Sequence, residues 1–271
     1  MTTIVAGPTR TLRIGWERGK LEVKEFFRQR ESVVFTLAFP VILLLFFSSV
    51  VNYQIPGNLK FSQYFLPGII AAGLFSVSFQ ALAIQISIER DRGLLKRLEG
   101  TPMPRGSYFI GKVIMVLTMG VFETVVLLAI GKALGKVDLP TDGGKWLTLA
   151  WMMVLSVASG AVLGITFSSL PRTAKAAPAT ITPIALVLQF ISGIYFVFTD
   201  APKWLQHIAA LFPLKWVAQG MRSVFLPDSY ATHESGGGWQ HGRTALVLLA
   251  WAVAGGLVAM RTFRWRTTKD S

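Results

Sequence analysis

The sequence predicts an all-α integral membrane protein with six transmembrane helices, an N-terminal amphipathic interface helix and an external re-entrant helical hairpin before the last span. Three observations predict this class. Of the 271 residues, 52% are hydrophobic and only 15% are charged, whereas a soluble domain is typically about 25% charged. Several apolar runs approach or exceed the ~20 residues that a helix needs to cross a bilayer. Lys and Arg collect in alternate segments between these runs, as they do in membrane proteins.

The N-terminal segment, residues 11–30, is too charged to cross a bilayer. Leu12, Trp16 and Val23 can share one helical face, with most basic side chains off that face. This pattern predicts a helix that lies in the plane of the membrane interface. Two glycines weaken the helix, and an ordinary juxtamembrane basic tail stays open as the alternative.

Six apolar runs predict the membrane spans. They cover residues 33–51, 64–88, 110–130, 146–170, 178–198 and 245–263. Small residues repeat every four positions on the fourth run, at Ser156, Gly160, Gly164 and Ser168. Because small side chains let two helix backbones approach closely, this face is expected to pack tightly against another helix.

The distribution of Lys and Arg predicts the orientation. The segments on one side of the membrane carry 18 of them and those on the other side carry 8, in loops of nearly equal total length. This bias places both termini in the cytoplasm. It also accounts for the formal net charge of +13 without nucleic-acid binding. The chain contains no Cys, which excludes disulfides, thiolate metal sites and Cys nucleophiles.

A densely charged stretch covers residues 89–105, on the cytoplasmic side by the same bias. Leu94, Leu95 and Leu98 form an apolar stripe bordered by charged side chains. This pattern predicts a short amphipathic helix from Asp91 to Glu99. A Thr-Pro pair then stops the helix, because proline disfavours the α region for the residue before it. We expect this segment to bind a cytoplasmic partner; an ordinary charged loop is the alternative.

No site for nucleotide, metal or catalysis is predicted. Gly106 to Lys112 imitates the spacing of a phosphate-binding loop, but Val113 stands where the magnesium-binding Ser or Thr would be. The three His residues lack the spacing of metal ligands. No Ser-His-Asp order or carboxylate pair is placed for catalysis, so the chain is not expected to be an enzyme.

Glu123 is the one acid deep inside a predicted span. A charge near the middle of a bilayer costs about 2.5–3.5 kcal/mol on insertion scales, so Glu123 should face the bundle or a cavity. In a functional role, it would receive a cationic group of a substrate or make a gating contact. In a structural role, it would be a protonated or hydrogen-bonded residue in helix packing. Gln189, Phe190 and Tyr195 are further candidates to line a pathway, although such residues usually pack.

The loop before the last span contains two short amphipathic segments within residues 203–225, separated by Pro213. They are too short to span and too apolar to lie free in water, which predicts a re-entrant or interfacial hairpin on the external side. A small external cap packed on the span ends is the alternative. Residues 230–242, with three consecutive glycines, are expected to form a mobile loop.

These segments, taken in order, resemble a known family. The matching residues are Glu89-Arg90-x-x-Gly93, Leu94-Leu95-Lys96-Arg97-Leu98, Thr101-Pro102-Met103-Pro104, Gly111-Lys112, Arg172-Thr173, Ile191 to Phe196, Pro202-x-Trp204-Leu205, Phe212-Pro213 and Met221-Arg222. Their order and spacing resemble those of type-2 ATP-binding-cassette exporter permeases, from the interface helix to the sixth span. The chain is most similar to bacterial permeases of drug, antibiotic and lipid exporters.

The resemblance implies a permease subunit in the cytoplasmic (inner) membrane without an ATP site of its own. Two permeases, a homodimer or a pair of related chains, would form the pathway. Each would receive one of two copies of an ATPase subunit, which binds ATP and Mg. The substrate would be a drug, as in multidrug resistance, an antibiotic or a lipid. A lipid-linked glycan or polysaccharide export permease, and a non-transport scaffold that docks an ATPase, stay open as alternatives.

The resemblance also implies roles for particular residues. The loop 89–105 would carry the coupling helix, which contacts or is oriented toward the ATPase through Glu89, Arg90, Arg92, Gly93, Leu95, Leu98, Glu99, Thr101 and Pro102. The two external half-helices would close the outer end of the pathway, with Trp204, Phe212, Pro213 and Trp216 as gate residues.

Overall fold

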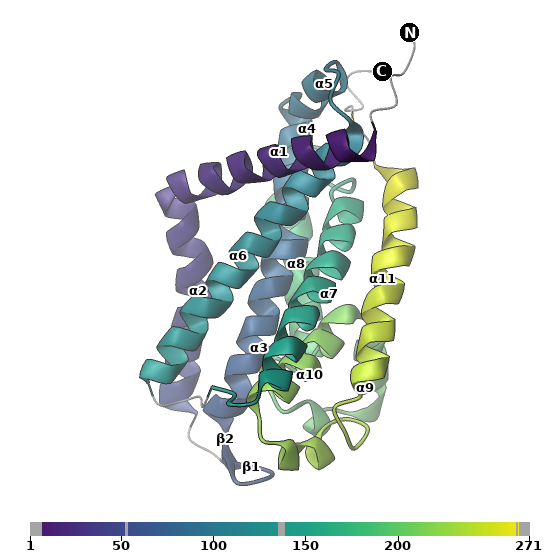
Figure 1. The fold of residues 1–271 in the computed structure, drawn as a ribbon. Coiled ribbons are helices and arrows are strands. Elements are labelled where there is room, and N and C mark those ends of the chain that lie inside the picture. The colour runs from purple at the N-terminus through teal and green to yellow at the C-terminus, as the bar shows by residue number, and fades with distance from the viewer. Residues whose placement is uncertain (1–6, 52–53, 135–138, 264, 266–271) are drawn as a thin grey trace.

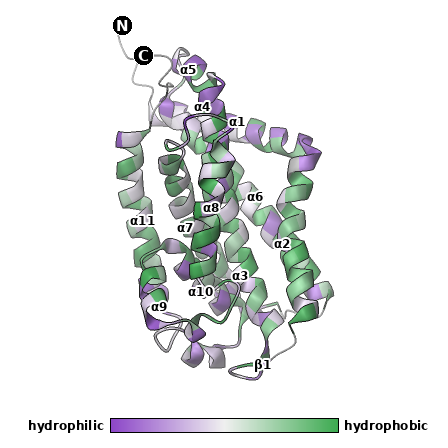
Figure 2. Cartoon of the chain, turned by 180° about the vertical axis from the view of Figure 1, so that it is seen from behind, coloured by the Kyte–Doolittle hydropathy of each residue, from purple (hydrophilic) through white to green (hydrophobic). Residues whose placement is uncertain are grey.

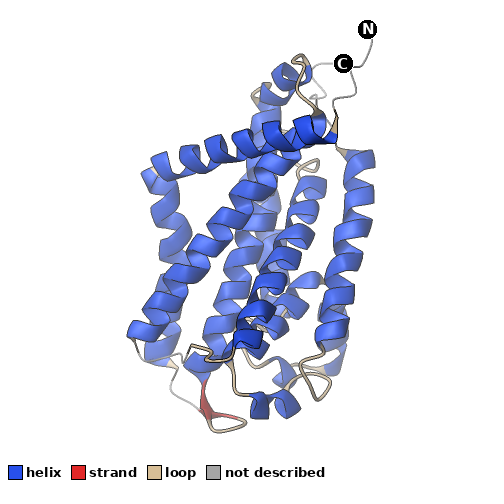
Figure 3. Ribbon diagram, in the orientation of Figure 1, coloured by secondary structure: helices blue, strands red, loops and turns tan. Residues whose placement is uncertain are grey.

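A computed structural model shows one bundle of long helices, which run between two ends of the molecule (Figure 1). The structure describes residues 7–51, 54–134, 139–263 and 265. We call the end that carries helices α1 and α5 the α5 end, and the opposite end, which carries the only described strands, the hairpin end. Those strands, β1 (Gln54–Ile55) and β2 (Leu59–Lys60), pair antiparallel (Figure 3).

The described helices follow the predicted order. Their bounds are α1 Pro8–Arg28, α2 Arg30–Val50, α3 Phe61–Phe75, α4 Leu82–Asp91, α5 Leu94–Glu99, α6 Arg105–Ala133, α7 Gly143–Phe167, α8 Ala177–Ile191, α9 Lys203–Ala210, α10 Pro213–Phe225 and α11 His241–Thr262. A π-helical turn, Ser76–Ala81, joins α3 to α4 without a break. This turn was not predicted, because the apolar pattern does not distinguish an i→i+5 turn from an α-helix. Short 3₁₀ segments lie at Phe198–Asp200 and Asp228–His233.

Five of these helices are long and apolar enough to cross a membrane: α2, the continuous helix from α3 to α4, α6, α7 and α11. The predicted fifth span, 178–198, is wrong in its length. Helix α8 has 15 residues and ends at Ile191. The chain turns there because Gly193 has φ +70°, a left-handed conformation that glycine adopts readily and that commonly ends helices. Whether α8 crosses the membrane, and with it the total of six spans, therefore stays a prediction.

The predicted helix from Asp91 to Glu99 is also corrected. Helix α4 continues to Asp91, and Gly93 then adopts φ +74°. This left-handed residue breaks the helix and redirects the chain, so that α5 is a separate helix of six residues. The chain between α4 and α6 is thus an angled projection from the bundle (Figure 1).

Helix α1 lies across the α5 end of the bundle rather than along it (Figure 1). It packs on α6, and its two glycines make this close crossing possible. A Cβ added at Gly15 or Gly19 would lie 2.6 or 2.7 Å from side-chain atoms of Ile110 or Ile114. The glycines that weaken the helix in isolation therefore serve its packing.

The small-residue face of α7 packs against the π-helical turn. A Cβ at Gly160 would overlap Ser78, and one at Gly164 would lie 2.9 Å from the backbone oxygens of Ser78 and Phe79. The close approach predicted from the four-residue repeat is confirmed. It fixes the middle of the helix from α3 to α4 in the bundle.

The flanks of the bundle are apolar and its ends are polar. Figure 2 shows hydrophobic residues along the long helices and hydrophilic residues concentrated on α1, α5 and the loops of the hairpin end. Large apolar side chains such as Phe39, Val125 and Val253 are more than half exposed on the flanks. Apolar side chains facing outward at mid-helix are stable in lipid and not in water, as expected for a membrane protein.

Candidate functional site

A buried ionic cluster at the α5 end joins three helices. Lys112 of α6 is fully buried, and its Nζ donates to Glu22 of α1 at 2.6 Å and to Glu89 of α4 at 2.5 Å. Tyr108, one turn earlier on α6, donates its hydroxyl to the other oxygen of Glu89 at 2.7 Å. Arg18 pairs with Glu22 at 3.1 Å and lies over the Tyr108 ring. We call these five residues the Lys112 cluster.

The Lys112 cluster balances its own charge. Two cations and two carboxylates lie together, so each buried charge has an opposite partner, which a charge out of water requires. Burial raises the pKa of Glu22, and Lys112 and Arg18 oppose that rise. The segment with phosphate-loop spacing thus ends in a lysine whose ammonium lies between carboxylates. The cluster fixes α1, α4 and α6 relative to one another.

A second set of contacts fixes the end of α4 to the turn between α7 and α8. The Arg90 guanidinium donates to the backbone oxygens of Ser168 and Pro171 at 2.7 and 2.9 Å. Asp91 accepts from the backbone N–H of Ala174 at 2.9 Å, and Ser87 also donates to the oxygen of Ser168. We call Ser87, Arg90 and Asp91, with the 168–174 turn, the Arg90 clasp. The base of the α5 projection is therefore held on two sides.

The residues predicted to couple to an ATPase fall into three groups by burial. Glu89, Arg90 and Leu95 are largely or fully inside the protein, a position that suits orienting the projection. The exposed members are Arg92, Thr101 and Pro102; Gly93, Leu98 and Glu99 are half-buried. Glu99 accepts from Arg105 at the start of α6 at 2.7 Å. No ATPase is present, so the contacts themselves stay a prediction.

Three of the four predicted pathway residues line one cavity. Glu123, Gln189 and Tyr195 contribute to a cavity of about 370 Å³ between α2, the α3–π turn, α6 and α8. The Tyr195 hydroxyl donates to Gln189 at 2.7 Å. Phe190 does not line the cavity; it is more than half exposed and its ring packs on Tyr195.

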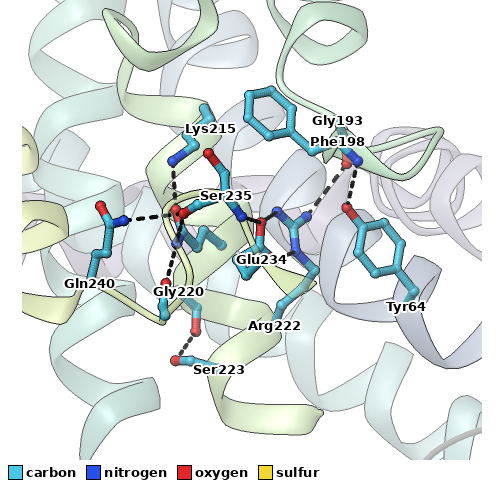
Figure 4. Close-up of polar contacts among 12 residues, drawn as sticks. Tyr64, Gly193, Phe198, Lys215, Gly220, Arg222, Ser223, Glu234, Ser235 and Gln240 are labelled. Carbon is cyan, nitrogen blue, oxygen red and sulfur yellow. Dashed lines mark hydrogen bonds and ion pairs between the residues drawn. The ribbon is translucent and has the colours of Figure 1, made fainter. Parts of the chain in front are cut away.

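The hairpin end contains a second buried ion pair (Figure 4). Arg222 of α10 donates to both oxygens of Glu234, at 2.8 and 3.1 Å. Its guanidinium lies 4.7 Å from the centre of the Tyr64 ring of α3. Burial disfavours the charge on Arg222, but Glu234 outweighs this effect and raises the pKa of Arg222. The Tyr64 hydroxyl accepts from the Phe198 backbone N–H at 3.1 Å.

The loop expected to be mobile is part of this network. Besides Glu234, it supplies the backbone oxygens of Ser235 and Gly238, which accept from Gln219 of α10. The Lys215 ammonium donates to the amide oxygen of Gln219 at 2.6 Å. Burial lowers the pKa of Lys215 to about 8. These contacts were not predicted, because the pairing of an acid with an arginine twelve positions away leaves no local pattern.

The predicted gate residues occupy different environments. All 13 residues of α10, including Pro213 and Trp216, are buried, whereas Trp204 of α9 is 64% exposed. Phe212 precedes α10 and stacks on Trp251 of α11. Helix α10 packs on α3 and α7 and is an integral part of the bundle. This arrangement tests neither the predicted re-entrant path of residues 203–225 nor their predicted gating role.

Sequence reasoning missed several members of these networks, among them Arg18, Glu22, Tyr108 and Glu234, and noted Lys112 only in a rejected phosphate-loop motif and in the family's Gly-Lys pair. One signal was available. Glu22 lies four residues after Arg18 and shares one helical face with Gly15 and Gly19. An acid on the packing side of such a helix indicates a buried cationic partner.

Comparison with known proteins agrees with the architecture. The family model described as "ABC-2 type transporter" matches residues 19–226. A relative from Escherichia coli named "Probable multidrug ABC transporter permease YbhR" is 24% identical over 172 residues, 64% of this chain and 46% of that protein. The chain thus spans about half the length of that relative. "Putative transport permease YvfS" of Bacillus subtilis is 22% identical over 192 residues, 71% of this chain and 77% of that protein.

A third relative is named for a different cargo. "Capsule polysaccharide export inner-membrane protein CtrC" of Neisseria meningitidis is 26% identical over 113 residues, 42% of this chain and 41% of that protein. The similarity of this chain to relatives with different named cargoes means that sequence similarity indicates the family and not the substrate.

Replacing Lys112 with Met should destabilise the fold strongly. Removing one partner of a buried ionic group leaves uncompensated charge and costs about 3–5 kcal/mol. Thermal unfolding in detergent should show this loss, while Lys132→Met, an exposed lysine at the far end of the same helix, should change little. An equal effect of the two substitutions would contradict the role of the Lys112 cluster.

The loss of stability caused by Lys112→Met should become smaller as the pH falls toward 4.5, the ordinary pKa of Glu22. The pKa of Glu22 is raised in the folded protein, so protonation favours the folded state and removes its need for a cation. Unfolding temperatures of wild type and variant at pH 8 and pH 5 measure this convergence. A constant difference between the two proteins would contradict it.

The pair at the hairpin end should show strong coupling in a double-mutant cycle. Arg222→Met and Glu234→Gln should each lower stability by about 3–5 kcal/mol, because each leaves the other charge buried. The double variant should lose much less than the sum of the single losses. Additive losses in thermal unfolding would show that the two side chains do not depend on each other.

Proposed function

The chain belongs to the ABC-2 type transporter family, and from this premise we propose that it is the membrane-spanning permease subunit of an ATP-driven exporter. The family model covers residues 19–226, from within α1 to the residue after α10. A transport role and a membrane location follow from the family and from the five candidate spans. The driving partner, the number of subunits and the substrate belong to the proposal.

The single observation that carries the proposal is the way the α5 projection is attached to the bundle. Helix α5 stands out from the α5 end (Figure 1), and its base is fixed by both the Lys112 cluster and the Arg90 clasp. A displacement of α5 would be transmitted to α1 and α6 through Lys112, and to the α7–α8 turn through Arg90. This attachment suits a part that receives force from a partner and passes it to several spans together.

The partner is proposed to be an ATPase subunit that binds ATP and Mg, with one copy on each of two permeases. The exposed surface of the projection is basic and partly apolar, since Arg92, Leu94 and Arg97 are all exposed. We assign contact with the ATPase to this surface and orientation of the projection to the buried Glu89 and Arg90. The basic bias of this end supports a cytoplasmic location.

Export of a hydrophobic or amphipathic substrate is the function we propose. The cavity that Glu123 lines is mostly apolar, and a relative is named a probable multidrug permease. A polysaccharide or lipid-linked glycan is the second candidate, favoured by the relative named for capsule polysaccharide export. Helices α9 and α10 would close the outer end of the pathway in either case.

Charge reversal on the exposed surface should uncouple the two subunits. Arg92→Glu should weaken association with the ATPase subunit by about tenfold or more, because the reversed charge would repel the partner surface that Arg92 attracts. Export and ATPase co-purification should both fall, while membrane insertion and thermal stability stay at the wild-type level. Lys203→Glu, an exposed lysine at the hairpin end, is the matched control and should leave association unchanged.

Glu99→Lys should also lower export, because the new lysine would repel Arg105, the partner of Glu99 in the structure, and displace the end of α5. Wild-type export by both Arg92→Glu and Glu99→Lys would overturn the assignment of this surface. Normal association in both variants with loss of export would place the defect in transmission and not in docking.

A further inference from the structure

The mid-bundle cavity lined by Glu123 is mostly apolar and carries one acid. Its volume is about 370 Å³, within the range of pockets that hold small organic molecules. Phe35 and Phe39 of α2 border it and are 75% and 57% exposed, so the cavity reaches the flank of the bundle. Glu123 is the single charged residue among the described residues that line it.

The Glu123 carboxylate has no cation of its own. The side chain is 3% exposed, and its Oε2 has no hydrogen-bond partner among the described residues. No described Lys, Arg or His forms an ion pair with it, in contrast to the paired Glu22, Glu89 and Glu234. An unpaired carboxylate in this position is costly. A ligand that brings a positive charge into the cavity would remove that cost.

The neutral polar groups around the cavity largely bond to one another. Gln80 donates to Thr182 at 3.1 Å and accepts from Ser76 at 3.4 Å. Tyr195 donates to Gln189. These groups are therefore already satisfied, and the carboxylate is the group with unmet bonding capacity. The aromatic rings of Phe35, Phe39 and Tyr195 provide surfaces that attract organic cations.

We propose that this cavity binds lipophilic monovalent cations, with Glu123 as their counter-ion. The inference rests on the proposed export function, because it names the class of substrate that the pathway would take. One carboxylate in an apolar cavity matches one positive charge on a hydrophobic body. The same arrangement disfavours anions, which the carboxylate repels, and dications, whose second charge would stay unpaired.

Gly73 of α3 keeps the carboxylate in place. A Cβ added at Gly73 would overlap the Glu123 carboxyl group, so the two residues are in direct contact and alanine at 73 would displace the acid. This contact supplies a second route to the same test, since it moves Glu123 without removing its charge.

The test is equilibrium binding of tetraphenylphosphonium to the full chain in lipid nanodiscs, with empty nanodiscs subtracted. Wild type should bind the cation, and Glu123→Gln should bind it about tenfold more weakly or worse. Neutral triphenylphosphine oxide should bind both proteins within about twofold. Gly73→Ala should weaken cation binding, whereas Gly256→Ala, where an added Cβ meets open space, should not.

Equal cation binding by wild type and Glu123→Gln would overturn the proposal. An equal loss of the neutral compound would also overturn it, because the cavity would then select shape and not charge. Glu123→Gln keeps the side-chain shape, and an unchanged unfolding temperature verifies the fold. Co-purification with the ATPase is measured separately. The cation-binding result therefore stands on its own if the proposed export function fails.

Discussion

The structure depends most on the buried ammonium of Lys112 between the carboxylates of Glu22 and Glu89. A helix that lies across the end of a bundle has little apolar surface to bury against the helix ends beneath it. Here the two glycines of α1 allow its backbone to approach α6 closely. The ionic contact then determines which turns of α1, α4 and α6 face one another. Buried ion pairs contribute little net stability but specify register well, and register is what an angled projection such as α5 requires.

The continuous helix from Phe61 to Asp91 connects the two ends of the molecule. At the hairpin end its Tyr64 lies under the Arg222 guanidinium and accepts from the backbone of Phe198. At the α5 end it supplies Glu89 and Arg90 to the two buried networks. Between them its π-helical turn packs against the small-residue face of α7. Since both networks share one rigid element, the two ends are mechanically linked without any contact between the networks themselves.

The sequence determined much of the fold through patterns of one helix or one turn. The order of the helices, the transverse N-terminal helix, the close packing at Gly160 and Gly164 and the break near Pro213 all follow from local composition and spacing. The missed features depend on pairs of distant residues. Glu234 finds Arg222 across a loop, and Lys112 finds Glu22 ninety positions earlier. A single sequence contains both partners but does not indicate that they meet.

The same distinction explains the errors at element ends. Gly93 and Gly193 end helices through left-handed backbone conformations, and glycines inside apolar runs are otherwise common in membrane helices. The prediction from composition therefore extended the fifth span to residue 198, and it joined the end of α4 and α5 into one helix. For the candidate site, burial was the missing quantity: the coupling residues looked alike in the sequence, and only packing separates Glu89 and Arg90 from the exposed Arg92.

The position of the π-helical turn relates the proposed cavity to the proposed drive. Ser76 and Gln80 of the turn line the cavity, and Gly73, one turn earlier, contacts Glu123 of α6. π-helical turns are rare in proteins and occur frequently at functional sites. The Lys112 cluster holds α4 and α6 together at the α5 end, so a displacement of α5 would be passed along the continuous helix to its π-helical turn. That turn lines the cavity beside the carboxylate proposed to hold the substrate, which connects the proposed binding site to the proposed drive.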